Sequence, residues 1–106
     1  MQERAFERIQ TRIRVRLFCG FMYFTGIVTN LSENGMCIHS SVCLPSESKF
    51  EVIINNRNQD LKTLVKVSRI VETGGYYDIM GVELLNSHSD YLEFVDGLRL
   101  VRKLPF

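Results

Sequence analysis

Three residues of one short polar segment have the types and spacing to hold a small polar ligand: Asn30, Ser32 and Gly35. An amide and a hydroxyl two residues apart offer donors and acceptors, and a glycine lets another group approach the backbone closely. The same residues are also typical of an ordinary turn, because Asn and Ser bond nearby backbone groups and Gly adopts positive φ without steric cost. The segment 30–35 alone therefore leaves two interpretations open, a plain polar turn and a binding site.

Arginines concentrate at the start of the chain, where Arg4 and Arg8 lie four residues apart and Arg12, Arg14 and Arg16 follow in alternation. A guanidinium group is always charged and forks onto paired oxygens, so this cluster indicates an anionic partner, most simply a phosphate. The alternative for the three alternating arginines is the solvated face of a strand.

The composition argues against several classes of function. Cys19, Cys37 and Cys43 form no CxxC pair, and neither histidine has ligand spacing to them, so we expect no metal, no cofactor and no disulfide framework. No nucleophile and base are arranged for catalysis, and we expect no catalytic residue and no enzyme. No apolar run approaches the roughly 20 residues of a membrane span and no signal peptide is evident, so we expect a cytoplasmic protein.

The elements that would position these residues are short strands within one domain of 106 residues. Over residues 11–18 the arginines alternate with Ile13, Val15 and Leu17, which predicts a half-buried strand. Further strands are expected at residues 22–29, 36–41, 49–54, 61–71 and 76–85, separated by turn-forming residues. Residues 1–10 are too short and too polar for a stable helix, and we assign them to a mobile arm.

The periodicity changes after residue 85. Tyr91, Phe94, Val95 and Leu98 recur at helical spacing, with Val101 extending the stripe, which predicts a C-terminal helix over about 89–102. Six strands at hairpin spacing followed by one helix indicate a sandwich or a small barrel. A barrel of this size is filled by its own side chains, so a ligand would bind outside it, on the surface or beneath the arm.

Two motifs occur in a defined order along this β-rich chain. The first is the RxxxR of Arg4-Ala5-Phe6-Glu7-Arg8, and the second is the [D/N]xSxxG of Asn30-Leu31-Ser32-Glu33-Asn34-Gly35. Together with the strands, the segment Gly81-Val82-Glu83-Leu84 and the final helix, they resemble the PilZ domain family over nearly the whole chain. The resemblance implies an all-β fold, a six-stranded antiparallel β-barrel with a C-terminal α-helix over residues 11–106, preceded by a ligand-clamping arm over residues 1–10.

The resemblance further implies that the ligand is the bacterial second messenger cyclic di-GMP. Arg4 and Arg8 match the family's ligand-clamping arginines, and Asn30, Ser32 and Gly35 match its contacts on the barrel surface. Asn30 and Ser32, two apart on a strand-like edge, are expected to point to the same side and read the polar edge of a guanine. Asn30 stands where many members have Asp, so its amide accepts hydrogen bonds without the charge assistance of a carboxylate. Arg4 lies close to Met1, which leaves little chain upstream to support the arm.

The function implied by the resemblance is a switch rather than catalysis: the ligand orders the arm against the barrel and changes the surface offered to a downstream protein partner. We expect a stand-alone receptor or adaptor, a monomer or homodimer, with no membrane insertion. One alternative is a PilZ-like protein-interaction module without nucleotide binding, against which the retained Arg4 and Arg8 argue. The other is a nucleic-acid-binding small barrel that uses the alternating arginines and nearby aromatic residues, against which the net charge of only +1 argues.

Overall fold

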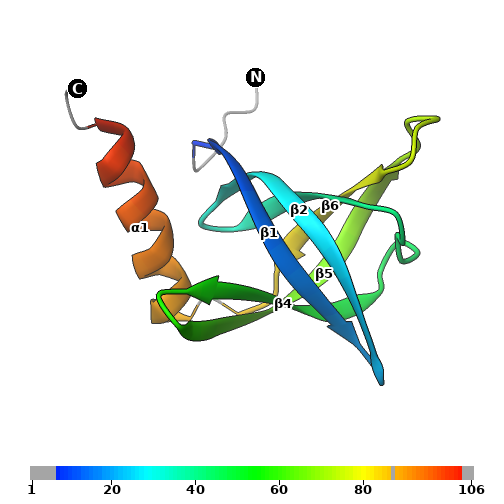
Figure 1. Ribbon diagram of the computed structural model, residues 1–106, viewed down its shortest axis with the longest axis horizontal. Helices are drawn as coiled ribbons and strands as arrows, with labels where there is room; N and C mark the ends of the chain where they lie inside the picture. Colours follow the sequence, from blue (N-terminus) through cyan, green and yellow to red (C-terminus); the bar gives the residue numbers. More distant parts are fainter. Residues whose placement is uncertain (1–6, 87, 104–106) are drawn as a thin grey trace.

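Six antiparallel strands and one helix make up the fold of this chain, in a computed structural model that describes residues 7–86 and 88–103 (Figure 1). In chain order the elements are β1 (Ile9–Cys19), β2 (Met22–Ser32), β3 (Gly35–Ser40), β4 (Lys49–Asn56), β5 (Gln59–Val71), β6 (Asp78–Leu84) and α1 (Ser89–Lys103). The strands close into a barrel in the order β1-β2-β3-β6-β5-β4, with β1 paired to β4. The predicted fold class, an all-β six-stranded antiparallel barrel with a C-terminal helix, is confirmed.

The barrel interior is filled by the apolar faces of the alternating strands. In β1 the side chains of Val15 and Leu17 are buried, whereas Arg12, Arg14 and Arg16 face outward, as the alternation predicts. Arg16 donates to Asp60 at 2.7 Å, in a pair whose side chains are 49% and 40% exposed. The three alternating arginines therefore lie on the solvated face of β1.

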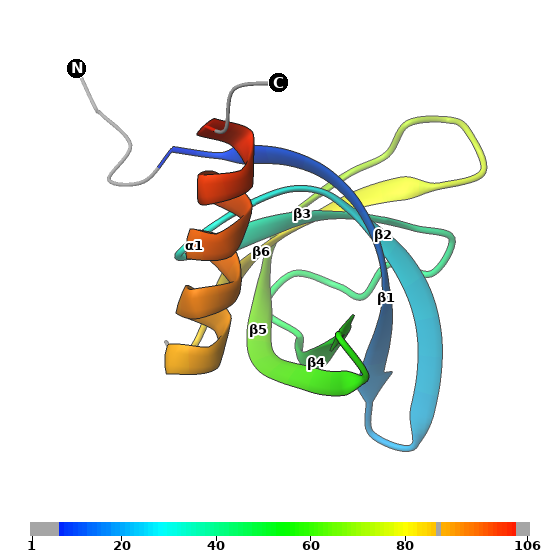
Figure 2. The same ribbon diagram turned by 60° about the vertical axis from the view of Figure 1, so that its left-hand side comes forward.

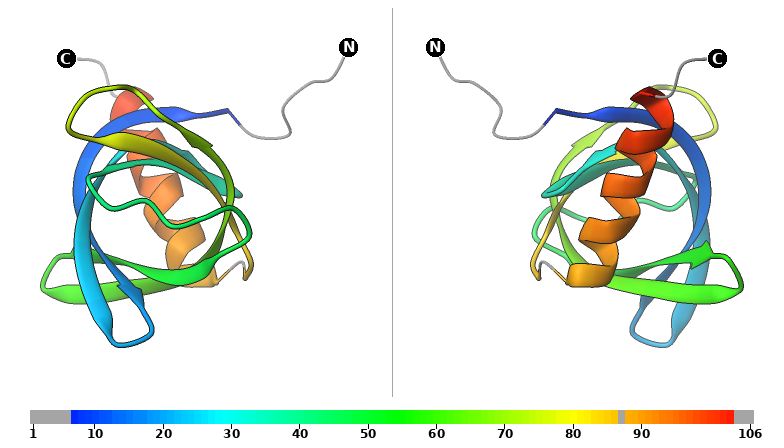
Figure 3. Two further views of the ribbon diagram at one scale, coloured as in Figure 1. Left: turned by 90° about the vertical axis from the view of Figure 1, so that its right-hand side faces the viewer. Right: turned by 90° about the vertical axis from the view of Figure 1, so that its left-hand side faces the viewer.

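α1 crosses the open end of the barrel, as the end-on views of Figure 3 show. Tyr91 and Val95 are fully buried in the core, and Phe94 and Leu98 pack against it. Val101 lines one hollow together with Phe94 and Leu98 but is 58% exposed, so the apolar stripe continues on this side of α1 without being buried there. Figure 2 shows α1 along one end of the barrel, with the start of β1 at the level of its last turns. No helix in the described part of the chain is both long and apolar enough to cross a membrane.

Four strands reach further than their sequence patterns indicated: β4 continues to Asn56, β5 begins at Gln59, and β1 and β2 are extended beside the motifs. β1 begins at Ile9, so Ile9 and Gln10, which we had assigned to the arm, pair with β2. β2 continues to Ser32, which reduces the expected polar turn to Glu33 and Asn34. Gly35 is the first residue of β3 and has no positive φ, unlike Gly20 and Gly74. The need for glycine at position 35 is therefore not conformational.

Candidate functional site

One residue from each of five neighbouring strands lies in a single line across the outer wall of the barrel. The ladders pair Gln10 with Asn30, Asn30 with Cys37, Cys37 with Gly81, and Gly81 with Arg69. We call these five residues the row. Since adjacent strands are about 4.8 Å apart, the row extends over about 19 Å, from β1 to β5.

Two bulges turn row residues outward. The ladders shift register between Val28 and Asn30 in β2 and between Val67 and Arg69 in β5. In a regular strand, residues two apart share a face, so Asn30 and Arg69 would point inward beside the fully buried Val28 and Val67. The extra residue of a bulge reverses this, and Asn30 is partly exposed while Arg69 is exposed.

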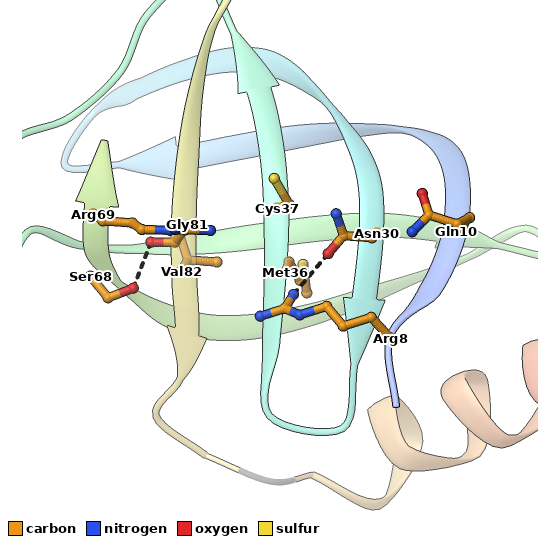
Figure 4. A pocket seen from close by; sticks show the side chains of 9 residues that line it. All are labelled: Arg8, Gln10, Asn30, Met36, Cys37, Ser68, Arg69, Gly81 and Val82. Carbon is orange, nitrogen blue, oxygen red and sulfur yellow. Dashed lines mark hydrogen bonds between the residues drawn. The ribbon is translucent and has the colours of Figure 1, made fainter. Parts of the chain in front are cut away.

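A hollow of about 220 Å³ lies over the row (Figure 4). It is lined by Arg8, Gln10, Asn30, Met36, Cys37, Ser68, Arg69, Gly81 and Val82. The lining contains two arginines and no carboxylate. The hollow is therefore polar and positively charged, which suits an anionic ligand with polar edges.

Arg8 connects the first sequence motif to the second. Its Nη1 donates to Oδ1 of Asn30 at 2.9 Å. A Cβ at Gly35 would lie 2.9 Å from the Val82 carbonyl oxygen and 3.4 Å from Nη2 of Arg8, so glycine is needed here for space. The structure thus brings Arg8, Asn30 and Gly35 together, whereas Arg4 lies outside the described residues.

Ser32 is placed differently from Asn30, because only 1% of it is exposed. Its hydroxyl donates to Oδ1 of Asn34 at 2.8 Å and accepts from the Asn34 amide at 3.4 Å. The Ser32 carbonyl accepts from the hydroxyl of Tyr91 at 2.6 Å. The sequence predicts that Asn30 and Ser32 both face the ligand from one open surface. In this structure only Asn30 does so, and the Ser32 hydroxyl instead shapes the turn.

The helix contacts both motifs, through residues that sequence reasoning did not select. Arg99 donates to both carboxylate oxygens of Glu33, at 2.6 and 3.0 Å, and also to the backbone carbonyl of Glu7. The hydrogen bonds from Arg99 hold the pKa of Glu33 below its usual value, and burial raises the pKa of Tyr91. No sequence pattern marks Arg99, because its partners lie 66 and 92 residues away.

Arg69 is the second residue that sequence reasoning missed. The sequence offers one signal, Gly81, because a glycine inside a strand is typical of a bulge or a close contact. The close contact is Arg69, whose Cγ and Nε lie 3.0 Å from where a Gly81 Cβ would be. Identifying that partner requires the β5–β6 register.

Comparisons with known proteins agree with this architecture. The family model described as PilZ domain matches residues 2–96. No curated protein matches the chain.

Several solved structures share the fold. One is the PilZ domain of YcgR from Escherichia coli with c-di-GMP, at 12% identity and a TM-score of 0.69, over 90% of this chain and 87% of that one. Another is the Bacillus subtilis inhibitor of motility MotI/DgrA, at 16% identity and a TM-score of 0.76. The match covers 99% of this chain and 55% of that one, so the chain spans about half the length of MotI/DgrA. A third is the PilZ domain of CeSA from a cellulose-synthesizing bacterium, at 18% identity and a TM-score of 0.66, over 88% and 98% of the two chains.

At sequence identities this low, the solved structures establish the fold alone. The family model in addition matches the sequence itself, over residues 2–96. Taken with the closed six-stranded barrel and its C-terminal helix, they show that the chain belongs to the PilZ domain family.

Proposed function

We propose that this PilZ domain is a receptor for cyclic di-GMP, which binds over the row and is clamped by Arg8. The observation that carries the proposal is the 2.9 Å hydrogen bond from Arg8 to Asn30, which joins the two motifs at the edge of the hollow. The absence of any carboxylate from the residues lining the hollow supports an anionic ligand. Support also comes from the YcgR PilZ domain, whose structure was solved with c-di-GMP.

The chemistry of the side chains fits this ligand. Cyclic di-GMP has two anionic phosphates and two guanines, and a guanidinium forks onto phosphate oxygens or onto guanine O6 and N7. The amide of Asn30 can both donate to and accept from a guanine edge. The hydrogen bond to Asn30 restrains the Arg8 side chain, so less side-chain entropy is lost when Arg8 engages a ligand.

The remaining proposed contacts have distinct parts in this scheme. Arg4, the other arginine of the first motif, is proposed to close on the ligand together with Arg8. Gly35 leaves room for Arg8 beside the Val82 carbonyl. Ser32 contributes by holding the turn through Asn34, which keeps the end of β2 in place beneath the ligand.

The domain would act as a switch for a partner protein, with no catalytic step. Binding through Arg4 and Arg8 would order the arm against the barrel. The arm would then change the surface beside α1, because Arg99 of the helix bonds the Glu7 carbonyl next to Arg8. A downstream protein would recognise that altered surface.

The proposal is tested by calorimetry with cyclic di-GMP on the wild type and on the Arg8→Ala variant. We expect saturable binding by the wild type and a loss of affinity of about tenfold to a hundredfold in the variant, because charge-assisted hydrogen bonds are lost. The matched control is Arg14→Ala, which removes an equal charge from the exposed face of β1 outside the hollow and should bind normally. No binding by the folded wild type would refute the function, and normal binding by Arg8→Ala would refute the role of Arg8.

A further inference from the structure

The side chain of Arg69 lies across β6 rather than projecting into solvent. Its Cγ and Nε would be 3.0 Å from a Cβ at Gly81, and its Cδ 3.6 Å away, so it occupies the space that any other residue at position 81 would fill. Figure 4 shows the guanidinium group passing Gly81 in the direction of Cys37, which lies on β3. The group therefore lies along the wall of the hollow, on the side away from Arg8.

Two further features hold this arrangement in place. The register shift between Val67 and Arg69 turns Arg69 to the outside of the barrel. The hydroxyl of the preceding residue, Ser68, donates to the Gly81 carbonyl at 2.9 Å and fixes β6 against β5 at this point. A bulge, a hydroxyl and a glycine thus all serve to lay one exposed arginine flat against the barrel.

The surroundings of Arg69 leave its charge available. Within residues 7–86 and 88–103, no carboxylate forms an ion pair with it, whereas Arg16 is paired with Asp60 and Arg99 with Glu33. Stability of the barrel does not require an unpaired cation at this position, since exposed charges contribute little. A planar guanidinium supported on a flat strand offers a face for stacking on a base and an edge that forks onto guanine O6 and N7.

We infer that Arg69 is a further ligand-binding residue, which engages a guanine of cyclic di-GMP by its plane and its fork while Arg8 binds from the opposite side. The inference rests on the proposed function. It adds to the contacts made by the two sequence motifs a residue of the row that belongs to neither motif, Arg69, with Gly81 leaving the space for it. It also assigns part of the recognition of a guanine to β5 and β6, in addition to Asn30 on β2.

The first test is calorimetry with cyclic di-GMP on Arg69→Ala and Arg69→Lys, with Arg14→Ala as the control for charge. We expect Arg69→Ala to weaken binding about tenfold or more, as for the loss of one bidentate base contact. Arg69→Lys should recover little of this, because an ammonium group keeps the charge without the plane or the fork. Binding by Arg69→Ala within twofold of the wild type, or full recovery by Arg69→Lys, would overturn the inference while leaving the proposed function intact.

The second test uses Gly81→Ala in the wild type and in the Arg69→Ala background. The three heavy atoms nearest the new Cβ all belong to Arg69, which is exposed and free to move aside, so the barrel should fold as before. We expect Gly81→Ala to weaken binding several-fold in the wild type and to have no further effect once Arg69 is removed. Equal effects in both backgrounds would show that Gly81 acts without Arg69 and would overturn the inference. No binding by the wild type itself would instead refute the proposed function.

Discussion

Arg99 binds Glu33 through two hydrogen bonds, of 2.6 and 3.0 Å, and this ion pair ties α1 to the β2–β3 turn. The two side chains are only 21% and 17% exposed, so water screens the pair less than it screens a surface pair. The same guanidinium donates to the Glu7 carbonyl, next to Arg8. One helix residue therefore fixes the positions of both segments that carry the sequence motifs.

The Arg99→Ala variant should lower the free energy of unfolding by about 1–2 kcal/mol, because Glu33 loses a bidentate charged partner in a partly buried place. The matched control is Arg16→Ala, which breaks the exposed pair with Asp60 and should cost less than about 0.5 kcal/mol. Urea unfolding of the two variants measures both values. Equal losses would contradict a special role for the helix contact.

Acid should weaken the Arg99–Glu33 pair in a defined direction. Because the pKa of Glu33 is lower in the folded protein than its ordinary value of 4.5, the stabilisation is complete above that value and is lost as the pH falls through the folded pKa. Between pH 7 and pH 3 the wild type should therefore lose more stability than Glu33→Gln, whose side chain does not titrate. Urea midpoints at several pH values test this, and parallel curves for the two proteins would show that Glu33 makes no such contribution.

Replacing two glycines by alanine should change the stability of the protein in opposite directions. At Gly35 a Cβ would lie 2.9 Å from the Val82 carbonyl, so Gly35→Ala should destabilise the barrel by about 1–3 kcal/mol and displace Arg8. At Gly97 in α1 a Cβ meets nothing within 4 Å, and Gly97→Ala should stabilise the protein by about 0.5–1 kcal/mol. Thermal unfolding decides both signs, and a stabilised Gly35→Ala protein would disprove the steric argument.

The buried hydroxyl of Thr63 has no hydrogen-bond partner in the described part of the chain. Thr63→Val keeps the shape of the side chain and removes that hydroxyl, so the variant should be more stable by about 1 kcal/mol. Thr63→Ser, which keeps the hydroxyl and loses a methyl group, should be less stable by a similar amount. Chemical denaturation of both variants tests this order of stability. A buried water bonded to the hydroxyl would make Thr63→Val less stable than the wild type instead.

Cys37 provides a chemical probe of the row without any substitution. Its side chain is partly exposed and lines the hollow, between Asn30 and Gly81 in register. Cyclic di-GMP bound over the row should slow alkylation of this thiol about tenfold or more at saturating ligand. Cys19 at the far end of β1 is the internal control, and peptide mapping by mass spectrometry separates the two. If the alkylation rate of Cys37 is the same with and without bound ligand, the ligand binds elsewhere.

Much of the barrel could be predicted because the alternation of apolar and polar residues in its strands follows directly from their burial. The alternation around Val15 and Leu17 directly records one buried and one solvated face. Strand ends were less predictable, since Asn30 and Ser32 suit a turn by composition but remain in β2, Asn30 through pairing with β1 and β3 and Ser32 through pairing with β3. Local propensity yields to such pairing, which depends on residues far away in the chain.

The site was predictable only where a motif carried it. Arg8, Asn30 and Gly35, which the structure brings together, could be chosen as candidates through the two motifs that resemble the PilZ family. Arg69 could not, because a bulge reverses its orientation and its neighbour Gly81 is defined by strand register. Arg99 likewise depends on how α1 crosses the barrel, which no single segment encodes.

Each residue of the row comes from a different strand, and ladders on both sides hold every one of these strands. A substitution in the row therefore leaves the backbone that carries the other four residues in place, and it reaches another row residue only through a side-chain contact such as that of Arg69 with Gly81. A site built on a single loop would instead change as a whole when any of its residues changed. If the proposed ligand binds over the row, the preference of such a barrel wall among ligands can be adjusted by changes on single strands while the closed ladders keep the fold.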